Sequence, residues 1–132
     1  MIKAFSVWML SLGGANMALA VALGAFGAHA LRARAEALPL ERGLEIWQTA
    51  VQYHLIHALG LIAIGLAASW LDGSSLRWSG GLMAAGILLF SGSLYLMTLT
   101  GWRLLGPLTP LGGLCLILGW LLFVVAVIRH GH

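Results

Sequence analysis

The feature that most constrains this sequence is the length of its uncharged segments. The segment Ala4–Leu31 contains no Asp, Glu, Lys or Arg, and as a helix it would extend about 42 Å at about 1.5 Å per residue. The hydrocarbon core of a bilayer is about 30 Å thick, so a tilted helix of this length spans it. Across the whole chain 61% of residues are hydrophobic and 8% are charged, which is too little polar surface for a water-soluble globule. The sequence therefore predicts an integral membrane protein.

Four such segments follow one another along the chain. They predict membrane-spanning helices at about 4–31, 49–71, 78–100 and 111–128, within a single domain of residues 1–132. The predicted fold class is an all-α integral membrane protein, a four-transmembrane-helix bundle with a short amphipathic interfacial helix before the second span. A signal peptide is the competing interpretation of the first segment, because Ala28–Ala30 resembles a cleavage site. Its apolar run, however, is about twice as long as the apolar core of a signal.

The predicted interfacial helix lies in the polar connection Arg32–Glu45. Pro39 suits the first position of a helix, and Gly43 is a candidate bend. A helix that starts at Pro39 carries one apolar stripe toward the second span, formed by Leu40, Leu44, Trp47 and Val51.

Small residues on two spans predict close helix packing. In the first span they form a stripe that also carries one amide: Asn16, Ala20, Gly24, Gly27 and Ala28. We expect Asn16 to form an interhelical hydrogen bond rather than to line a path for solutes. We also expect Gly24→Leu to be poorly tolerated.

Thr109 and Pro110 are predicted as the N-cap and first-turn proline of the fourth span. That span has its own small face, formed by Gly112, Cys115 and Gly119.

Polar side chains are concentrated at one end of the predicted bundle. The stretch Trp47–His57 carries two glutamines, a tyrosine and two histidines at the entrance of the second span. The end of the first span and the end of the third span reach the same membrane face. Together these segments supply a candidate polar cluster: His29, Gln52, Tyr53, His54, His57, Ser91, Tyr95 and Thr98. Counted along the helices from Trp47 and Gly101, His54 and Tyr95 both lie about 10 Å deep.

The second span presents its polar residues in two directions. At about 100° per residue, Tyr53, His54 and His57 share one arc, and the two glutamines point nearly opposite. An unpaired imidazole inside a bilayer costs several kcal/mol, so the histidines are expected to be neutral and hydrogen-bonded. We expect the arc with the histidines to face the bundle and to meet a polar partner, with Tyr95 as the preferred one. Any contact between subunits should use the Gln52 side.

Four ordered motifs carry a resemblance to a known family. They are GAFGAHAL at 24–31, WxTAVQYHxxHAL at 47–59, FSGSLY at 90–95 and TPLGG at 109–113. Over nearly its whole length the chain resembles the domain of unknown function 423 family, small four-span membrane proteins of bacteria related to eukaryotic transmembrane protein 256. The resemblance implies this architecture and residence in the bacterial inner membrane. It implies no catalytic residue.

Several functions are compatible with the polar cluster. The leading interpretation is a non-enzymatic scaffold or accessory subunit whose polar residues specify helix packing. The alternative is a half-membrane-deep pocket in which Tyr53, His54 and Gln52 bind a quinone or a lipid headgroup, or a haem or metal held by His29, His54 and His57, with Cys115 as a fourth ligand. Transport lacks a polar path through the apolar half of the bundle. Surface enzymes would depend on neutral histidine, since no carboxylate lies within a predicted span. No cofactor and no catalytic residue is assigned.

The charged residues predict partners and orientation. The net charge of +3 comes from residues at the ends of the spans, which indicates anchoring at the membrane surface rather than nucleic-acid binding. The expected partners are the lipid bilayer and a second copy of the chain or a larger membrane complex. The basic residues on the polar-cluster face, Arg32, Arg34, Arg42 and Arg103, outnumber Lys3, Arg77 and Arg129 on the other face by one. This excess predicts cytoplasmic connections on the polar-cluster face and external termini.

Overall fold

Four long helical segments make up most of the structure, a computed structural model that describes residues 2–131. Each is long and apolar enough to cross a membrane: Ala4–Leu31, Gly43–Ala67, Ser74–Thr100 and Arg103–His130. In chain order the elements are α1 (Ala4–Phe26), the π-helical turn η1 (Gly27–Leu31), the 3-10 turn η2 (Ala35–Ala37), α2 (Gly43–Ala67), α3 (Ser74–Ile87), the π-helical turn η3 (Leu88–Gly92), α4 (Ser93–Thr100), the 3-10 turn η4 (Arg103–Leu105) and α5 (Leu108–His130). The predicted all-α four-span bundle is confirmed.

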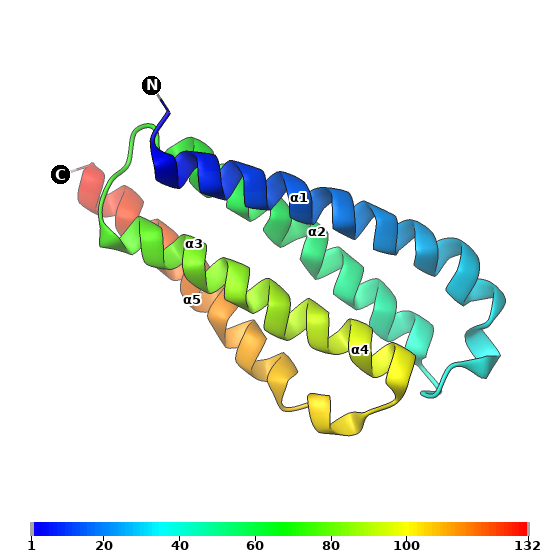
Figure 1. The fold of residues 1–132 in the computed structure, drawn as a ribbon. Coiled ribbons are helices and arrows are strands. Elements are labelled where there is room, and N and C mark those ends of the chain that lie inside the picture. The colour runs from blue at the N-terminus through cyan, green and yellow to red at the C-terminus, as the bar shows by residue number, and fades with distance from the viewer. Residues whose placement is uncertain (1, 132) are drawn as a thin grey trace.

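Neighbouring spans run in opposite directions (Figure 1). Both chain ends and the turn between α2 and α3 lie at one end of the bundle, which we call the terminal end. The turns η2 and η4 lie at the opposite end, the connection end. Helix α1 packs along α2, and α3 packs along α5. The two pairs meet where α2 contacts α3 and α4, so α2 lies at the centre of the bundle.

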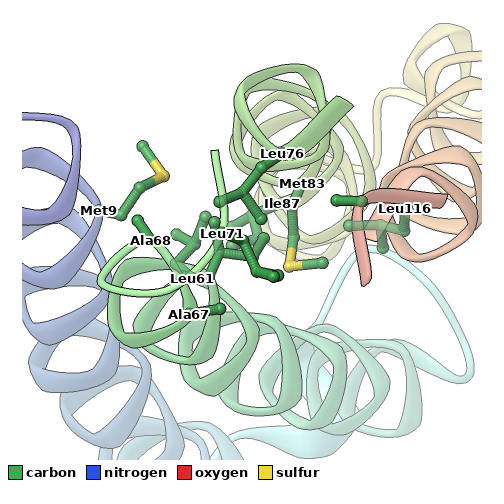
Figure 2. Close-up of a cluster of buried hydrophobic side chains, with 11 residues drawn as sticks. Met9, Leu61, Ala67, Ala68, Leu71, Leu76, Met83, Ile87 and Leu116 are labelled. Atoms are coloured by element: carbon green, nitrogen blue, oxygen red, sulfur yellow. The ribbon is translucent and has the colours of Figure 1, made fainter. Parts of the chain in front are cut away.

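The apolar core lies toward the terminal end. In Figure 2, Met9 approaches from α1, while Met83 of α3 lies between Leu61 of α2 and Leu116 of α5. Leu61 and Met83 are fully buried. The core cluster consists of Met9, Leu61, Ile64, Ala67, Ala68, Leu71, Leu76, Met83, Ile87, Leu116 and Ala126. Apolar side chains fill the half of the bundle at the terminal end. Most of the buried polar side chains therefore lie outside that half, between the middle of the bundle and the connection end.

Glycines set the closest approaches between helices. A Cβ added to Gly112 of α5 would lie 2.3 Å from the backbone nitrogen of Phe90 in η3, and one added to Gly13 of α1 would lie 2.9 Å from the backbone nitrogen of Ile62 in α2. A side chain at either position would therefore force two backbones apart. Gly112 belongs to the predicted small face. On the first span the predicted stripe meets α2 in part, since Ala20 is fully buried and Ala28 is exposed.

The helix predicted to start at Pro39 is absent from the described connection. The connection holds only the three-residue turn η2, and α2 begins at Gly43, where a bend was predicted. Leu38 has extended backbone angles, φ −68° and ψ 145°, the conformation that a following proline favours. The ring of Pro39 packs against Gly101, which has φ +71° at the end of α4. This contact between the two connections holds Pro39 in a loop.

The predicted cap of the fourth span is also wrong. Helix α5 begins at Leu108 and follows Pro107, without a side-chain cap, so Thr109 lies inside the first turn. The Thr109 hydroxyl instead lies 2.6 Å from the hydroxyl of Ser93 on α4. A bond to a neighbouring helix has replaced the local cap. Pro110 remains in the first turn, where its missing N–H leaves no helical hydrogen bond unmade.

An ion pair joins the beginning of α1 to the turn between α2 and α3. Lys3 Nζ donates to Asp72 Oδ1 at 2.6 Å. Both side chains are exposed at the terminal end, outside the four spans. The hydrogen bond from Lys3 and its positive charge lower the pKa of Asp72 below its ordinary value.

Candidate functional site

A chain of hydrogen-bonded side chains joins three helices at mid-height in the bundle. Nδ1 of His54 on α2 lies 2.9 Å from the hydroxyl of Tyr95 on α4, and its Nε2 lies 2.9 Å from Oδ1 of Asn16 on α1. The His54 side chain is only 3% exposed. We call these three residues the polar network. The predicted partnership of His54 with Tyr95, and the predicted interhelical bond of Asn16, are confirmed.

The hydrogen bonds assign a single arrangement of protons to the polar network. Asn16 Nδ2 donates to the carbonyl oxygen of Leu12 at 2.9 Å, so Asn16 Oδ1 faces His54 as an acceptor. His54 therefore carries its proton on Nε2 and donates it to Asn16. In a neutral imidazole the other nitrogen accepts, so the Tyr95 hydroxyl donates to Nδ1. Every member is neutral, as a site within a bilayer requires.

Two members of the network, Asn16 and His54, lie near the middle of their helical segments. Asn16 is about 18 Å along the helix from Ala4 and about 22 Å from Leu31, and His54 is about 17 Å from Gly43. The depth of about 10 Å predicted for His54 was counted from Trp47, and α2 begins before that residue, at Gly43.

His57 faces a different neighbour from His54. Its Nδ1 donates to the carbonyl oxygen of Tyr53, one turn earlier on the same helix, at 2.7 Å. Its ring lies 6.0 Å from that of Trp120 on α5 and is stacked with that of Tyr53 at the same separation. Both histidines are buried, as predicted. His54 faces α1 and α4, whereas His57 faces α5, so the two do not form one site.

The three hydroxyl residues predicted to share one face of the third span, Ser91, Tyr95 and Thr98, all face α2. Ser91 donates to the carbonyl oxygen of Ala50 at 2.8 Å. Thr98 donates to its own Leu94 carbonyl at 2.9 Å, and a weaker contact of 3.4 Å reaches Gly43 at the start of α2. The predicted shared face is therefore present, with Tyr95 between the two.

Three predicted cluster residues lie outside this arrangement. His29, in η1, and Gln52, on α2, are exposed, and Tyr53 is 40% exposed while its ring packs 4.5 Å from that of Phe90. The π-helical turn changes the direction of the side chains around His29, and the sequence carries no clear signal of such a turn. Gln52 points away from the histidines, as predicted.

The three histidines of the proposed haem or metal centre do not come together among the described residues. Among residues 2–131, no three His, Cys, Asp or Glu side chains come close enough to share an ion. Both ring nitrogens of His54 already have partners, and His29 is exposed on another helix. Cys115 is a free thiol on α5. The hypothesis of ligation by His29, His54 and His57 is therefore not supported by the geometry.

Two residues complete the site although the predicted cluster omitted them. Asn16 was assigned to helix packing, but it is the only amide of the first span and lies near its middle, and that position was a usable signal. Trp47 is 2% exposed, and its Nε1 donates to the carbonyl oxygen of Leu23 at 2.9 Å. Its ring lies 4.7 Å from that of Tyr95 and 5.6 Å from that of Phe26. Trp47 thus supports Tyr95 from the connection end.

A groove lies beside the polar network, between α1 on one side and α3, η3 and α4 on the other. Its volume is about 280 Å³. Apolar side chains form most of its wall, and its four polar lining residues are Asn16, His54, Ser91 and Tyr95. We call it the lateral groove, because α1 and α3 flank α2 here without packing on each other (Figure 1). The site combines a neutral hydrogen-bonded floor with an opening toward the lipid.

Comparison with known proteins shows the family to which the chain is related. A family described as "Protein of unknown function (DUF423)" matches residues 23–113. The chain belongs to the DUF423 family. It is 48% identical over 120 residues to the UPF0382 membrane protein YwdK of Bacillus subtilis (strain 168), which covers 90% of this chain and 94% of that protein. It is 42% identical over 118 residues to the UPF0382 membrane protein SERP0230 of Staphylococcus epidermidis, with 89% and 93% covered.

This DUF423 protein is therefore a small integral membrane protein of the bacterial inner membrane, as predicted. The description of the family assigns it no activity. No solved structure matches the chain. The family match includes His54 and Tyr95, while Asn16 precedes it.

Proposed function

We propose that this DUF423 protein is a non-enzymatic accessory or scaffold subunit of the membrane. The observation that carries the proposal is that its buried polar side chains join one helix to another. The polar network links α1, α2 and α4, Ser91 links η3 to α2, and Ser79 links α3 to α5 through the carbonyl of Gly119 at 2.6 Å. No buried side-chain nitrogen or oxygen within residues 2–131 lacks a hydrogen-bond partner. Groups used in this way specify how the helices pack.

A second copy of the chain fits the proposal as the partner on the Gln52 side. A hollow of about 320 Å³ lies there between α1 and α2, with Gly24, Ala28, Gln48 and Gln52 in its lining. The two glutamines are exposed, and an amide that faces lipid is costly until it finds a partner. Two-fold pairing would bring each Gln52 toward its equivalent, while the small residues allow the helices to approach.

Analysis of the purified protein tests the proposal. After mild solubilisation, elemental analysis and an absorbance spectrum should reveal no stoichiometric metal or haem. Gln52→Cys in a Cys115→Ala background should form a disulfide-linked dimer in membranes, and Leu118→Cys on the exposed side of α5 should not. A stoichiometric metal or haem would overturn the accessory role, and equal cross-linking at both positions would remove the proposed pairing face.

A second candidate function is the binding of a lipid-soluble ligand in the lateral groove. The specific observation in its favour is the polar floor formed by Asn16, His54, Ser91 and Tyr95 inside an otherwise apolar cavity. An apolar pocket with a few convergent polar groups is the usual form of a small-molecule site. Binding of this kind is compatible with a subunit that performs no chemistry.

A further inference from the structure

We infer that the lateral groove binds a neutral quinone-type ring that enters sideways from the bilayer, with a ring carbonyl accepting a hydrogen bond from Asn16. The inference rests on the ligand-binding candidate above and adds the class of ligand, its route of entry and the group that recognises it.

The groove is bounded at both ends along the membrane normal. Toward the terminal end α1 meets α3, where a Cβ added to Gly80 would lie 2.7 Å from Met9 Sδ and 3.2 Å from the ring of Phe5. Toward the connection end Trp47 lies between Phe26 of α1 and Tyr95 of α4. Between these contacts the groove faces the lipid past exposed leucines such as Leu19 and Leu88. A ligand therefore enters from the hydrocarbon rather than from water.

The depth of the polar floor selects the class of lipid. Asn16 lies near the middle of a span, about 18 Å along the helix from its nearer end, whereas phospholipid headgroups stay at the surfaces of a hydrocarbon core about 30 Å thick. A charged or zwitterionic group at this depth would be costly. A neutral ring with carbonyl groups dissolves in hydrocarbon and can reach the network.

The polar floor retains hydrogen-bonding capacity that suits such a ring. One N–H of Asn16 is used by the Leu12 carbonyl, which leaves the second amide hydrogen as a donor for a ring carbonyl. The Tyr95 oxygen donates its only proton to His54 and keeps its lone pairs, and Ser91 donates to Ala50 and keeps its own. These two oxygens can accept from the hydroxyl of the reduced ring. Both the quinone and the quinol therefore find complementary groups.

The size of the groove is consistent with a ring rather than a whole lipid. Its volume of about 280 Å³ lies near the lower limit of small-molecule pockets, about 300 Å³. A bound ring would fill the polar part, and its hydrocarbon tail would leave past Leu19 or Leu88 into the bilayer.

Equilibrium binding of decylubiquinone to the protein in phosphatidylcholine nanodiscs tests the inference. Gly92 lines the groove, and a Cβ added there would have only Leu88 Cδ1 within 4 Å, at 3.8 Å. The Cβ of a leucine at this position therefore meets no close contact, and Gly92→Leu is designed to fill the groove while leaving the residues of the polar network unchanged. Its matched control is Gly81→Leu, at an exposed position of α3 with no atom within 4 Å of an added Cβ. We expect saturable binding to the native protein and to Gly81→Leu, and about tenfold weaker binding to Gly92→Leu.

A second probe separates recognition of the ring from occupation of the groove. Decylbenzene has the same tail and a ring without carbonyls, and it should bind more weakly than decylubiquinone. Asn16→Leu should weaken decylubiquinone binding by about threefold to tenfold, the range expected for one hydrogen bond, and leave decylbenzene unchanged. Equal binding of the two probes to the native protein would overturn the quinone inference and leave groove binding intact. Equal binding of decylubiquinone to the native protein and to Gly92→Leu would overturn both the quinone inference and the binding of any ligand in the lateral groove.

Discussion

At the scale of single residues, the two buried histidines differ in the hydrogen-bond partners of their rings. His54 bonds to side chains on two other helices, whereas His57 bonds to a carbonyl of its own helix. An interhelical hydrogen bond in a membrane protein contributes about 0.6–1.7 kcal/mol. A local bond to a carbonyl that already accepts a helical N–H contributes less. The two histidines should therefore respond differently to the same substitution.

We expect His54→Leu to lower the free energy of unfolding by about 1–3 kcal/mol, because two interhelical bonds are lost and Asn16 and Tyr95 lose their partner. His57→Leu should cost less than about 1 kcal/mol, since leucine fills a similar apolar space beside Trp120. Equilibrium unfolding of both variants in mixed micelles measures the difference. A larger loss for His57→Leu than for His54→Leu would contradict the role assigned to the polar network.

The pair Lys3–Asp72 predicts a dependence of stability on pH. The pKa of the Asp72 carboxyl is lowered in the folded protein by Lys3, below its unfolded value of about 3.9. Stabilisation by the pair is therefore fully present above about pH 3.9, and it is lost as the pH falls through the lower folded value. The melting temperature of the native protein should exceed that of Asp72→Asn at pH 7 and low salt, and the two should converge in strong acid or about 1 M salt. A constant difference across this range would show that the carboxylate charge is not responsible.

Part of the candidate site was predictable from single residues. The meeting of His54 and Tyr95 followed from helical spacing and from the cost of an unpaired imidazole in lipid. The position of His29 outside the polar network was not predictable. His29 lies in the π-helical turn η1, and the effect of such a turn on side-chain direction depends on packing rather than on a local sequence signal. The groove itself was also beyond the sequence, since it depends on the way α1 and α3 diverge on either side of α2.

At the scale of elements, the sequence was sufficient to predict that the four helices exist, but not to predict the residues at which they begin and end. Four apolar segments longer than the bilayer core leave no alternative to four helices, because the backbone must satisfy its hydrogen bonds internally. Their ends depend on contacts between distant segments. Pro39 is held in a loop by Gly101, and the hydroxyl of Thr109 bonds to Ser93 instead of capping α5. Local signals at both places were overridden by tertiary contacts.

The contact between α5 and η3 predicts opposite effects at two adjacent glycines. A Cβ at Gly112 would lie 2.3–2.8 Å from backbone atoms of Leu89 and Phe90, whereas one at Gly113 would lie 3.8 Å from the Phe90 ring. Gly112→Ala should therefore cost about 1–3 kcal/mol through forced separation of the helices. Gly113→Ala should be neutral or stabilising by up to about 1 kcal/mol, because alanine favours a helix. Unfolding measurements on the two variants compare them, and equal stabilities would argue against this close approach.

The small stripe of the first span gives a milder expectation. A Cβ at Gly24 would lie 3.2 Å from Val51 Cγ1, the end of a side chain rather than a backbone. Gly24→Leu remains a predicted loss of stability and assembly, but Gly112 is the sharper test of close packing.

At the scale of the whole molecule, the chain divides along the membrane normal into regions of different chemistry. The apolar core lies toward the terminal end, the polar network lies near the middle, and four arginines lie at the connection end. This order disfavours a continuous polar path, because the terminal half offers few polar side chains to a solute. It favours a protein that meets its ligand or partner from within the membrane.

The last prediction concerns how the molecule is inserted. Basic residues near the ends of spans set orientation, and acidic residues contribute little to it, so the pairing of Lys3 with Asp72 does not cancel Lys3. Four basic side chains at the connection end oppose three at the terminal end. We therefore expect the connections in the cytoplasm and the chain ends outside, so a C-terminal alkaline phosphatase should be active and a C-terminal green fluorescent protein dark.

Because this margin is a single charge, orientation should respond to small changes. Ser74→Lys together with Ser75→Lys adds two charges at the terminal end and should reverse the activities of the two reporters. Thr100→Lys together with Leu104→Lys adds two at the connection end and serves as the matched control, which should strengthen the original pattern. Cytoplasmic chain ends in the unmodified protein, or reporters that ignore both pairs, would mean that charge at these ends does not determine the orientation of this bundle.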